Sequence, residues 1–327
     1  MNQRPLGSTG LTVSELGFGC GSVGGLMVRG DPAGQRRAVA RALDAGITYF
    51  DTAPSYGDGR SEENLGRALR DLNAWDRVVV GTKVRLSPED LTAAPAAIRR
   101  SIEQSLTRLG RDSVDLLQLH NQIIDGTDTN RGIPVDDALG SIAEGLQQIV
   151  AAGLARHAGI TGTGDPDAIK RVIRSGAIAT VQSYFNALNP SSGFPGASGG
   201  AHDFAGLIDD AATAGLGVIA IRVMAAGALS GTTDRAANAS SIPAAPLVSG
   251  GDFEQDVART HRLATLAENP GLESTLELAV RFALTKPGIS TVLVGYSDTH
   301  QLEQAIAWTE RGPLPDEAIE QIVAAAS

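Results

Sequence analysis

The chain has 327 residues, of which 27 are Lys or Arg and 37 are Asp or Glu, giving a formal net charge of −10. Hydrophobic residues make up 42% and charged residues 20%, a balance typical of folded globular proteins. The acidic charge disfavours nucleic-acid binding, and no apolar run approaches the roughly 20 residues of a membrane helix. The lone cysteine, Cys20, excludes an internal disulfide and a multi-cysteine metal site, and no metal site is predicted. Because the N-terminus lacks an apolar leader, we expect a cytoplasmic protein.

The N-terminal segment predicts a small β-hairpin, in which residues 4–6 and 11–13 flank a Gly-Ser-Thr-Gly turn. Residues 16–19 are the first expected buried strand, and a glycine-rich segment, residues 20–25, follows it. A helix is expected at residues 32–45, because a proline stands at its start and Gly46 follows its end.

The same alternation of strand and helix continues to the end of the chain. Further strands are expected at the short apolar runs 47–51, 78–83, 114–120, 158–161, 179–182, 218–221 and 290–294. Further helices are expected at residues 61–70, 94–109, 135–152, 166–175, 204–214, 252–267, 276–285, 299–309 and 316–325. Ser61 is expected to cap the first of these helices.

Near-continuous apolar strands that alternate with helices are typical of a parallel sheet covered on both faces. Eight such units in this length, with no linker between them, predict an α/β fold: a TIM (β/α)8 barrel. We expect a single domain of residues 1–327, with the N-terminal hairpin and an extra C-terminal helix. Loops that follow barrel strands lie on the face where substrates bind. We therefore expect pocket walls from residues 23–30, 121–134, 189–203 and 224–252.

Four titratable residues lie at the C-terminal ends of three consecutive predicted strands: Asp51, Tyr56, Lys83 and His120. Each has an ordinary structural explanation. A strand-end Asp often caps a helix, a Lys is often a solvated charge, and a lone His or loop Tyr often only packs. Chance does not readily place all four at adjacent positions of one barrel mouth, so we interpret them as a catalytic group.

These residue types suit one reaction in particular. A lysine cation beside a tyrosine lowers the pKa of the phenol, and a carboxylate holds the lysine in place. The tyrosine can donate a proton to a carbonyl oxygen while the carbon accepts a hydride, and a histidine can orient and polarise that carbonyl. In the reverse direction the phenolate deprotonates an alcohol. The set has no nucleophile–base pair and no metal cluster, which argues against hydrolysis.

Several segments together resemble the aldo-keto reductase superfamily over essentially the whole chain. They are LGSTGLTVSELGFGCG at 6–21, DTAPSYGDGRSEENLGRAL at 51–69, GTK at 81–83, LLQLH at 116–120, IT at 160–161 and VQSYFN at 181–186. The resemblance implies an eight-stranded α/β barrel with a catalytic tetrad of Asp51, Tyr56, Lys83 and His120, in which Tyr56 is the general acid or base. It also implies NAD(P)-dependent reduction of aldehydes or ketones, or oxidation of the matching alcohols or aldoses.

The resemblance further implies where a nicotinamide cofactor binds, without a Rossmann glycine motif. The implied contacts are Gly21, Ser22, Thr161, Gln182, Arg222, Gly227, Leu229, Gly295, Ser297, Asp298 and Gln301. Gln182 stands where relatives hydrogen-bond the carboxamide. Two positions depart from the family pattern. Gly162 replaces an asparagine, and the segment around Arg222 lacks the aromatic residue that stacks on the nicotinamide, so an apolar or guanidinium face must replace it.

The residues after the eighth predicted strand bear on the choice between NAD(H) and NADP(H). Relatives that prefer NADP carry Arg or Lys there, because a 2′-phosphate needs cationic donors. This chain has Ser297, Asp298 and Gln301 instead. A carboxylate at this position would repel the phosphate and could accept a hydrogen bond from a free ribose hydroxyl. We therefore expect NADP(H) or NAD(H) to be used, with a weak lean toward NAD(H).

Two alternatives to this reading stay open: a non-enzymatic nicotinamide-binding regulatory subunit of the same fold, and another TIM-barrel enzyme such as an isomerase or hydrolase. The expected partner is a small carbonyl or sugar-like substrate, and the expected assembly is a monomer or weak homo-oligomer. Tyr184 and Phe185 are candidates either for the pocket or for the core. The other aromatic and histidine residues considered, Trp75, Trp308, His157, His202 and His261, are expected to be structural or superficial.

Overall fold

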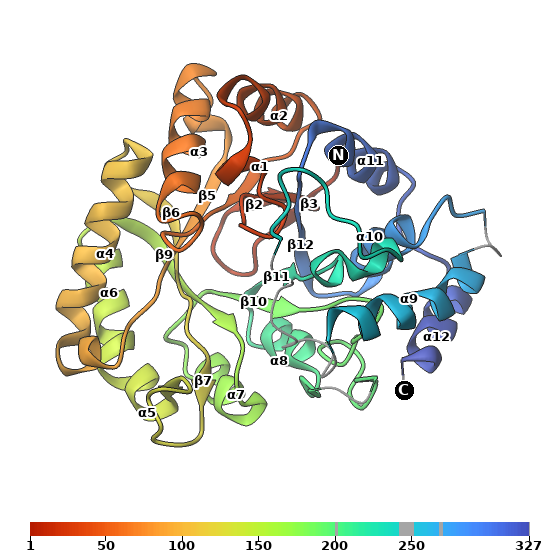
Figure 1. Ribbon diagram of the computed structural model, residues 1–327. Coiled ribbons are helices and arrows are strands. Elements are labelled where there is room, and N and C mark those ends of the chain that lie inside the picture. The colour runs from red at the N-terminus through yellow and green to blue at the C-terminus, as the bar shows by residue number, and fades with distance from the viewer. Residues whose placement is uncertain (200–201, 242–251, 268–270, 327) are drawn as a thin grey trace.

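The computed structural model describes residues 1–199, 202–241, 252–267 and 271–326. Eight parallel strands close into a barrel in the order β10-β11-β12-β3-β4-β5-β6-β9 (Figure 1). The strands are β3 (Leu16–Gly19), β4 (Tyr49–Asp51), β5 (Val79–Val84), β6 (Val114–Leu119), β9 (Ala155–Gly162), β10 (Thr180–Tyr184), β11 (Gly217–Ile221) and β12 (Ile289–Gly295). The predicted TIM barrel is confirmed.

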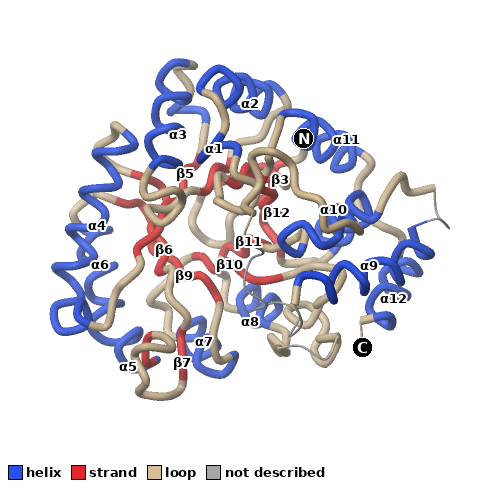
Figure 2. Tube along the Cα trace, viewed as in Figure 1, coloured by secondary structure: helices blue, strands red, loops and turns tan. Residues whose placement is uncertain are grey.

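Helices surround the barrel on its outer side, as Figure 2 shows. They are α2 (Pro32–Asp44), α3 (Arg60–Asp71), α4 (Ala94–Leu109), α5 (Val135–Asp137), α6 (Ala143–Ala151), α7 (Pro166–Arg174), α8 (Leu207–Thr213), α9 (Phe253–Ala267), α10 (Thr275–Thr285), α11 (Thr299–Glu310) and α12 (Asp316–Ala325). Their apolar faces pack on the outside of the strands, which accounts for the apolar character of strands buried on both sides. The extra C-terminal helix, α12, is confirmed.

The predicted N-terminal hairpin closes one end of the barrel. Its strands, β1 (Gln3–Pro5) and β2 (Thr12–Ser14), pair antiparallel. Leu6 and Val13 from this hairpin are fully buried and share a cluster with Tyr49, Leu116 and Ile219 from barrel strands. Because apolar side chains fill this end, we expect a ligand to enter the barrel from the opposite end.

Several predicted boundaries were wrong. The helix expected at 135–152 is interrupted between α5 and α6, where Gly140 has non-helical backbone angles (φ −94°, ψ −110°). Ser61 does not cap α3, because that helix follows Gly59, whose φ is +87°. Instead, the Ser61 hydroxyl donates to the Cys20 carbonyl and pairs with the Thr52 hydroxyl, which joins α3 to the ends of β3 and β4.

The loops after β3 and β6 contain small elements that their sequences did not predict. Helix α1 (Leu26–Arg29) follows β3, and the short pair β7 (Ile123–Ile124) and β8 (Ile133–Pro134) follows β6. Part of the expected pocket loop 224–252, residues 242–251, lies outside the described residues. Within the ranges that are described, no helix combines the length and hydropathy needed to cross a membrane.

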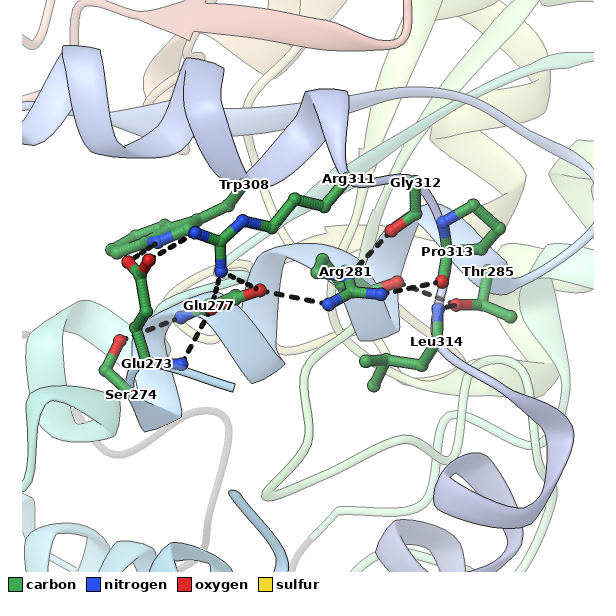
Figure 3. Close-up of polar contacts among 10 residues, drawn as sticks. All are labelled: Glu273, Ser274, Glu277, Arg281, Thr285, Trp308, Arg311, Gly312, Pro313 and Leu314. Carbon is green, nitrogen blue, oxygen red and sulfur yellow. Dashed lines mark hydrogen bonds and ion pairs between the residues drawn. The ribbon is translucent and has the colours of Figure 1, made fainter. Parts of the chain in front are cut away.

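A network of ion pairs fastens α10 to α11 and to the segment that follows α11 (Figure 3). Glu277 is fully buried and accepts hydrogen bonds from Arg281 and Arg311, each at 3.0 Å. Arg311 also pairs with Glu273, which accepts a hydrogen bond from the indole of Trp308. Arg281 donates onward to the carbonyl of Gly312 at 2.8 Å. A buried carboxylate with two guanidinium partners therefore ties three segments together.

Replacing Glu277 with alanine is expected to lower the free energy of unfolding by about 3 kcal/mol, because the poorly exposed Arg281 would lose its carboxylate partner. Urea denaturation measures the change. Glu103→Ala is the matched control, since Glu103 pairs with Arg99 at 3.4 Å on the exposed face of α4, and about 0.5 kcal/mol or less is expected there. Equal losses in the two variants would contradict a stabilising role for the buried network.

Candidate active site

A cavity of about 810 Å³ lies at the C-terminal ends of the barrel strands. Its walls come from the ends of β3, β4, β9, β10, β11 and β12 and from the segments that follow several of them. Three of the four predicted catalytic residues, Asp51, Tyr56 and His120, line this cavity, and the fourth, Lys83, lies behind Asp51 and Tyr56. The structure therefore brings the predicted group together at the open end of the barrel.

Lys83 and Asp51 form a buried ion pair. Asp51 is the last residue of β4 and pairs with Gly81 of the neighbouring strand β5, so Lys83 lies two residues farther along the same strand. The ammonium of Lys83 binds Asp51 Oδ1 and donates to the Thr52 carbonyl at 2.8 Å. Burial acts to lower the pKa of Lys83, whereas Asp51 and Tyr56 act to raise it. Their combined effect is larger, so the net shift of the pKa is upward. Lys83 is therefore a fixed cation.

The second oxygen of Asp51 accepts hydrogen bonds from three neutral groups inside the barrel. Tyr49 donates through its hydroxyl at 3.0 Å, Gln118 through Nε2 at 3.2 Å and Gln182 through Nε2 at 2.7 Å. Asp51 is thus held by four donors from β4, β5, β6 and β10. This arrangement fits a carboxylate that positions Lys83 rather than one that exchanges protons with a bound molecule.

Tyr56 lies between Lys83 and His120. The Lys83 Nζ is 4.9 Å from the centroid of the Tyr56 ring, and the Tyr56 and His120 rings meet edge to face at 5.8 Å. Burial raises the pKa of Tyr56, and the cation of Lys83 only partly offsets that effect. The expected lowering of the phenol pKa is therefore wrong as a net direction, although Lys83 acts in the expected sense. Tyr56 is a protonated phenol at neutral pH.

His120 follows the end of β6 and is a neutral imidazole. Burial lowers its pKa to about 3, and the nearby cations Lys83, Arg85 and Arg222 act in the same direction. A neutral ring carries one N–H donor, which can hold a carbonyl oxygen next to the Tyr56 hydroxyl. The pair thus offers a proton donor and a second polar contact to the same atom.

Most of the predicted cofactor contacts lie in the walls of this cavity. Those that line it are Gly21, Ser22, Thr161, Gln182, Arg222, Gly227, Gly295, Ser297, Asp298 and Gln301. Leu229 does not, because its side chain is fully buried in the core. Its carbonyl instead accepts a hydrogen bond from the Thr275 hydroxyl at 2.6 Å, at the start of α10. The Leu229 prediction is corrected accordingly.

Several of these residues have hydrogen-bond partners within the chain. Gln182 donates to Asp51, and its oxygen faces the Thr161 hydroxyl at 3.4 Å. Asp298 is the N-cap of α11 and accepts a hydrogen bond from the Gln301 backbone at 2.9 Å. The Gln301 side chain in turn accepts from the Ser297 backbone at 2.8 Å. The wall at the start of α11 is therefore held in one arrangement by its own hydrogen bonds.

One part of the wall, within residues 234–240, comes from the predicted pocket loop 224–252 and lines the cavity as expected. This segment is fastened to the loop after β3 by Arg29, whose Nε donates to the Asn238 carbonyl at 2.8 Å, and by the Ser240 backbone, which donates to Val23. Asn238 Nδ2 donates to the Ser297 carbonyl at 2.9 Å. These contacts join segments that are far apart in the sequence, so no local sequence pattern predicts them.

Other pocket expectations were wrong. No described residue of 121–134 or 189–203 lines the cavity. Asn189, Ser191 and Ser192 are buried instead, where Asn189 accepts from the Ser191 hydroxyl. Tyr184 does line the cavity, whereas Phe185 stacks on Phe282 in the core at 5.0 Å. Trp308, expected to pack only, is 3% exposed but also contributes to the cavity wall.

The chemistry of the walls fits a nicotinamide dinucleotide. A Cβ at Gly21 would lie 3.8 Å from the Tyr56 ring, so the missing side chain keeps open the space in front of the phenol. Arg222 Nη1 is buried and has no hydrogen-bond partner among the described residues, which suits a bound molecule that carries acceptors. The polar residues Ser22, Ser297 and Gln301 also line the same cavity.

Comparisons with known proteins identify the family to which the chain belongs. The sequence model of the Aldo/keto reductase family matches residues 15–327. L-galactose dehydrogenase from Arabidopsis thaliana is 30% identical over 312 residues, covering 93% of this chain and 86% of that protein. D-threo-aldose 1-dehydrogenase from Pseudomonas sp is 35% identical over 191 residues, covering 51% of this chain and 55% of that protein.

A solved structure resembles the whole chain. It is the holo form of aldo-keto reductase AKR11C1 from Bacillus halodurans, with a TM-score of 0.72 and 27% identity, covering all of this chain and 97% of that one. The relatives are named as dehydrogenases and reductases, which supports an oxidoreductase enzyme over a non-enzymatic subunit, an isomerase or a hydrolase. The chain therefore belongs to the Aldo/keto reductase family of oxidoreductases.

Proposed function

We propose that this enzyme uses a nicotinamide cofactor to interconvert the carbonyl and hydroxyl groups of small polar substrates, with Tyr56 as the general acid or base. The observation that carries the proposal is the convergence of a protonated phenol, a buried Lys83–Asp51 pair and a neutral imidazole on one end of the cavity. When bound, the nicotinamide supplies or accepts a hydride.

Each residue of the group has one role in this proposal. In the reducing direction, the Tyr56 hydroxyl gives its proton to the carbonyl oxygen, and Lys83 stabilises the phenolate that remains. His120 holds the same oxygen through its single N–H, and Asp51 keeps Lys83 in place. In the oxidising direction the phenolate takes the proton from the substrate hydroxyl. No group other than Tyr56 needs to change its charge.

Aldoses and other small hydroxy-aldehydes are the proposed substrate class. L-galactose dehydrogenase and D-threo-aldose 1-dehydrogenase are both named for sugar substrates. A screen of aldehydes, ketones and aldoses in both directions, with each of the two cofactors, tests the proposal. Activity that depends on nicotinamide and is lost in Tyr56→Phe supports it. Binding of the cofactor without turnover of any substrate would instead favour a regulatory subunit.

The dependence of the rate on pH follows from the two shifted groups. Reduction needs the protonated phenol, and the pKa of Tyr56 is raised by burial, so kcat for reduction is expected to stay constant through neutral pH and to fall only above about pH 10. Oxidation needs the phenolate and should rise with pH over that same range. His120, with a pKa of about 3, adds no inflection near neutrality. Full pH profiles of kcat check this, and a step near about pH 6.5 would contradict a neutral His120.

We also propose that NAD(H) is used at least as well as NADP(H). Ser297, Asp298 and Gln301 line the cavity at the start of α11, and Asp298 brings a negative charge to a wall where a 2′-phosphate would need cations. Arg235 also lines the cavity, but its Nε and Nη1 already donate to the carbonyls of Ser240 and Ala226. Part of the Arg235 donor set is therefore already engaged with backbone carbonyls, and only its remaining donors could meet a phosphate at this wall.

The variant Asp298→Asn isolates this charge, because asparagine can still cap α11. Its ratio of kcat/KM for NADPH to that for NADH is expected to rise roughly fivefold to tenfold over the wild-type ratio, since one repulsive charge is removed. Asp316→Asn, at the exposed start of α12, is the matched control and should leave the ratio unchanged. A wild-type enzyme that strongly prefers NADPH would refute the proposed preference.

A further inference from the structure

Arg222 has an unusual backbone conformation at the mouth of the barrel. It follows Ile221, the last residue of β11, and its φ is +58°, a left-handed value that few residues other than glycine adopt. Its carbonyl accepts hydrogen bonds from Asn186 Nδ2 at 3.1 Å and from the Ala225 backbone at 2.8 Å. Surrounding contacts therefore hold a strained backbone in place, and strain of this kind is concentrated at functional sites.

The guanidinium of Arg222 contributes to the cavity wall without an ion-pair partner in the described part of the chain. Its Nη1 is buried with no hydrogen-bond partner there, and its Cζ lies 5.9 Å from the centroid of the Tyr184 ring. Lys83 differs in this respect, because its positive charge forms an ion pair with the carboxylate of Asp51. Arg222 thus brings to the cavity a charge that no carboxylate among the described residues pairs with.

This charge acts on the residues that hold the reacting carbonyl. The charge of Arg222 acts to lower the pKa of both Tyr56 and His120, although burial is the largest effect on each and the net shift of Tyr56 is upward. Any molecule that reacts beside Tyr56 and His120 is therefore within the electrostatic range of Arg222. A nicotinamide ring that exchanges a hydride with that molecule would also lie within the electrostatic range of Arg222.

We propose that Arg222 makes this site bind the reduced nicotinamide cofactor more tightly than the oxidised one. The inference rests on the proposed function. The two cofactor forms differ by one hydride, so the oxidised ring carries a positive charge and the reduced ring is neutral. A cation fixed nearby repels only the oxidised form. Inside a partly desolvated cavity, one unit charge several ångströms away changes a binding constant by roughly tenfold or more.

The consequence for this enzyme concerns direction. Tighter binding of the reduced form means that the hydride step, once both ligands are bound, is shifted toward cofactor reduction and substrate oxidation. Release of the reduced cofactor then becomes slower than release of the oxidised one. Arg222 would therefore set which of the two forms the enzyme retains between turnovers.

Equilibrium binding tests the inference without any turnover. The dissociation constants of NAD⁺, NADH, NADP⁺ and NADPH are measured by quenching of tryptophan fluorescence, which Trp308 in the cavity wall makes suitable, and by calorimetry. The readout is the ratio of Kd for the oxidised form to Kd for the reduced form of each cofactor. Wild-type ratios are expected above one. In Arg222→Met both ratios should fall by roughly tenfold, whereas Arg222→Lys, which keeps the charge, should retain most of the preference.

Two controls keep the test specific. Arg37→Met removes the same charge from the exposed face of α2 and should leave both ratios unchanged. Thermal unfolding of Arg222→Met establishes that the variant is folded, and Arg222→Gln is a second neutral variant if it is not. An unchanged ratio in the neutral variants overturns the inference while the proposed function stands. If no form of either cofactor binds the wild-type enzyme, the proposed function itself fails.

Discussion

Replacing Tyr56 with phenylalanine is expected to lower kcat for aldehyde reduction by about 10²- to 10⁴-fold, the range typical of a positioned general acid. The variant loses one hydroxyl and keeps the ring that meets His120 edge to face at 5.8 Å. The dissociation constant of the cofactor and the melting temperature should therefore stay close to the wild-type values. Steady-state kinetics with a simple aldehyde, combined with cofactor binding, measures both parts of this prediction.

Tyr296→Phe is the matched comparison for Tyr56→Phe. Tyr296 lies beside the same cavity with its ring packed on Phe18 at 5.1 Å, and its hydroxyl has no partner among the described residues. Loss of that hydroxyl should change kcat by no more than about threefold, since no proton transfer is assigned to it. Comparable losses in the two variants would mean that neither phenol is the proton donor and that the assignment of Tyr56 is wrong.

The variant Lys83→Met is expected to lose both activity and stability. Removing the ammonium leaves the Asp51 carboxylate buried with only neutral donors, which should lower the free energy of unfolding by about 3 to 5 kcal/mol. The phenolate of Tyr56 would also lose its cation, so kcat should fall by about 10²-fold or more. Denaturation with urea and steady-state kinetics at neutral pH measure the two effects.

A double variant separates the two roles of Lys83. Asp51→Asn combined with Lys83→Met removes both charges, so it should recover much of the lost stability while kcat stays low. Lys286→Met is the control, because Lys286 pairs with Asp209, whose side chain is 57% exposed, and a loss of about 1 kcal/mol or less is expected. A double variant as unstable as the single one would argue against an unpaired buried carboxylate as the cause.

The strand ends were predictable because a single sequence signal, the end of an apolar run, marks each of them. Each barrel strand is an apolar run, and the first polar residue after the run lies at the open end of the barrel, as Asp51 and His120 do. Parallel pairing then brings such residues together without further information. The ion pair between Lys83 and Asp51 follows from adjacent strands, which are next to each other in both sequence and space.

The parts that could not be predicted depend on contacts between distant segments. Leu229 lies in a glycine-rich stretch, and neighbouring residues of that stretch line the cavity. The Leu229 carbonyl, however, accepts a hydrogen bond from the start of α10, which holds its backbone in the core. The polar segment 189–203 was expected to face a substrate, but its residues Asn189 and Ser191 hydrogen-bond to each other, and Ser191 also accepts from the Phe204 backbone inside the protein. Likewise, the net pKa of Tyr56 depends on how deeply the ring is buried, which no sequence pattern specifies. Composition alone does not distinguish a polar loop that binds ligand from one that packs.

The hydrogen bond between Gln182 and Asp51 has a consequence for the order in which the protein folds. The two residues are 131 positions apart, and their strands, β4 and β10, lie across the barrel from each other. Asp51 therefore lacks one of its donors in any partly folded chain where the first strands have formed but β10 has not docked. Contacts this distant in sequence form late, because closing so long a loop is entropically unfavourable. Recovery of catalytic activity during refolding should consequently follow closure of the barrel rather than formation of its helices.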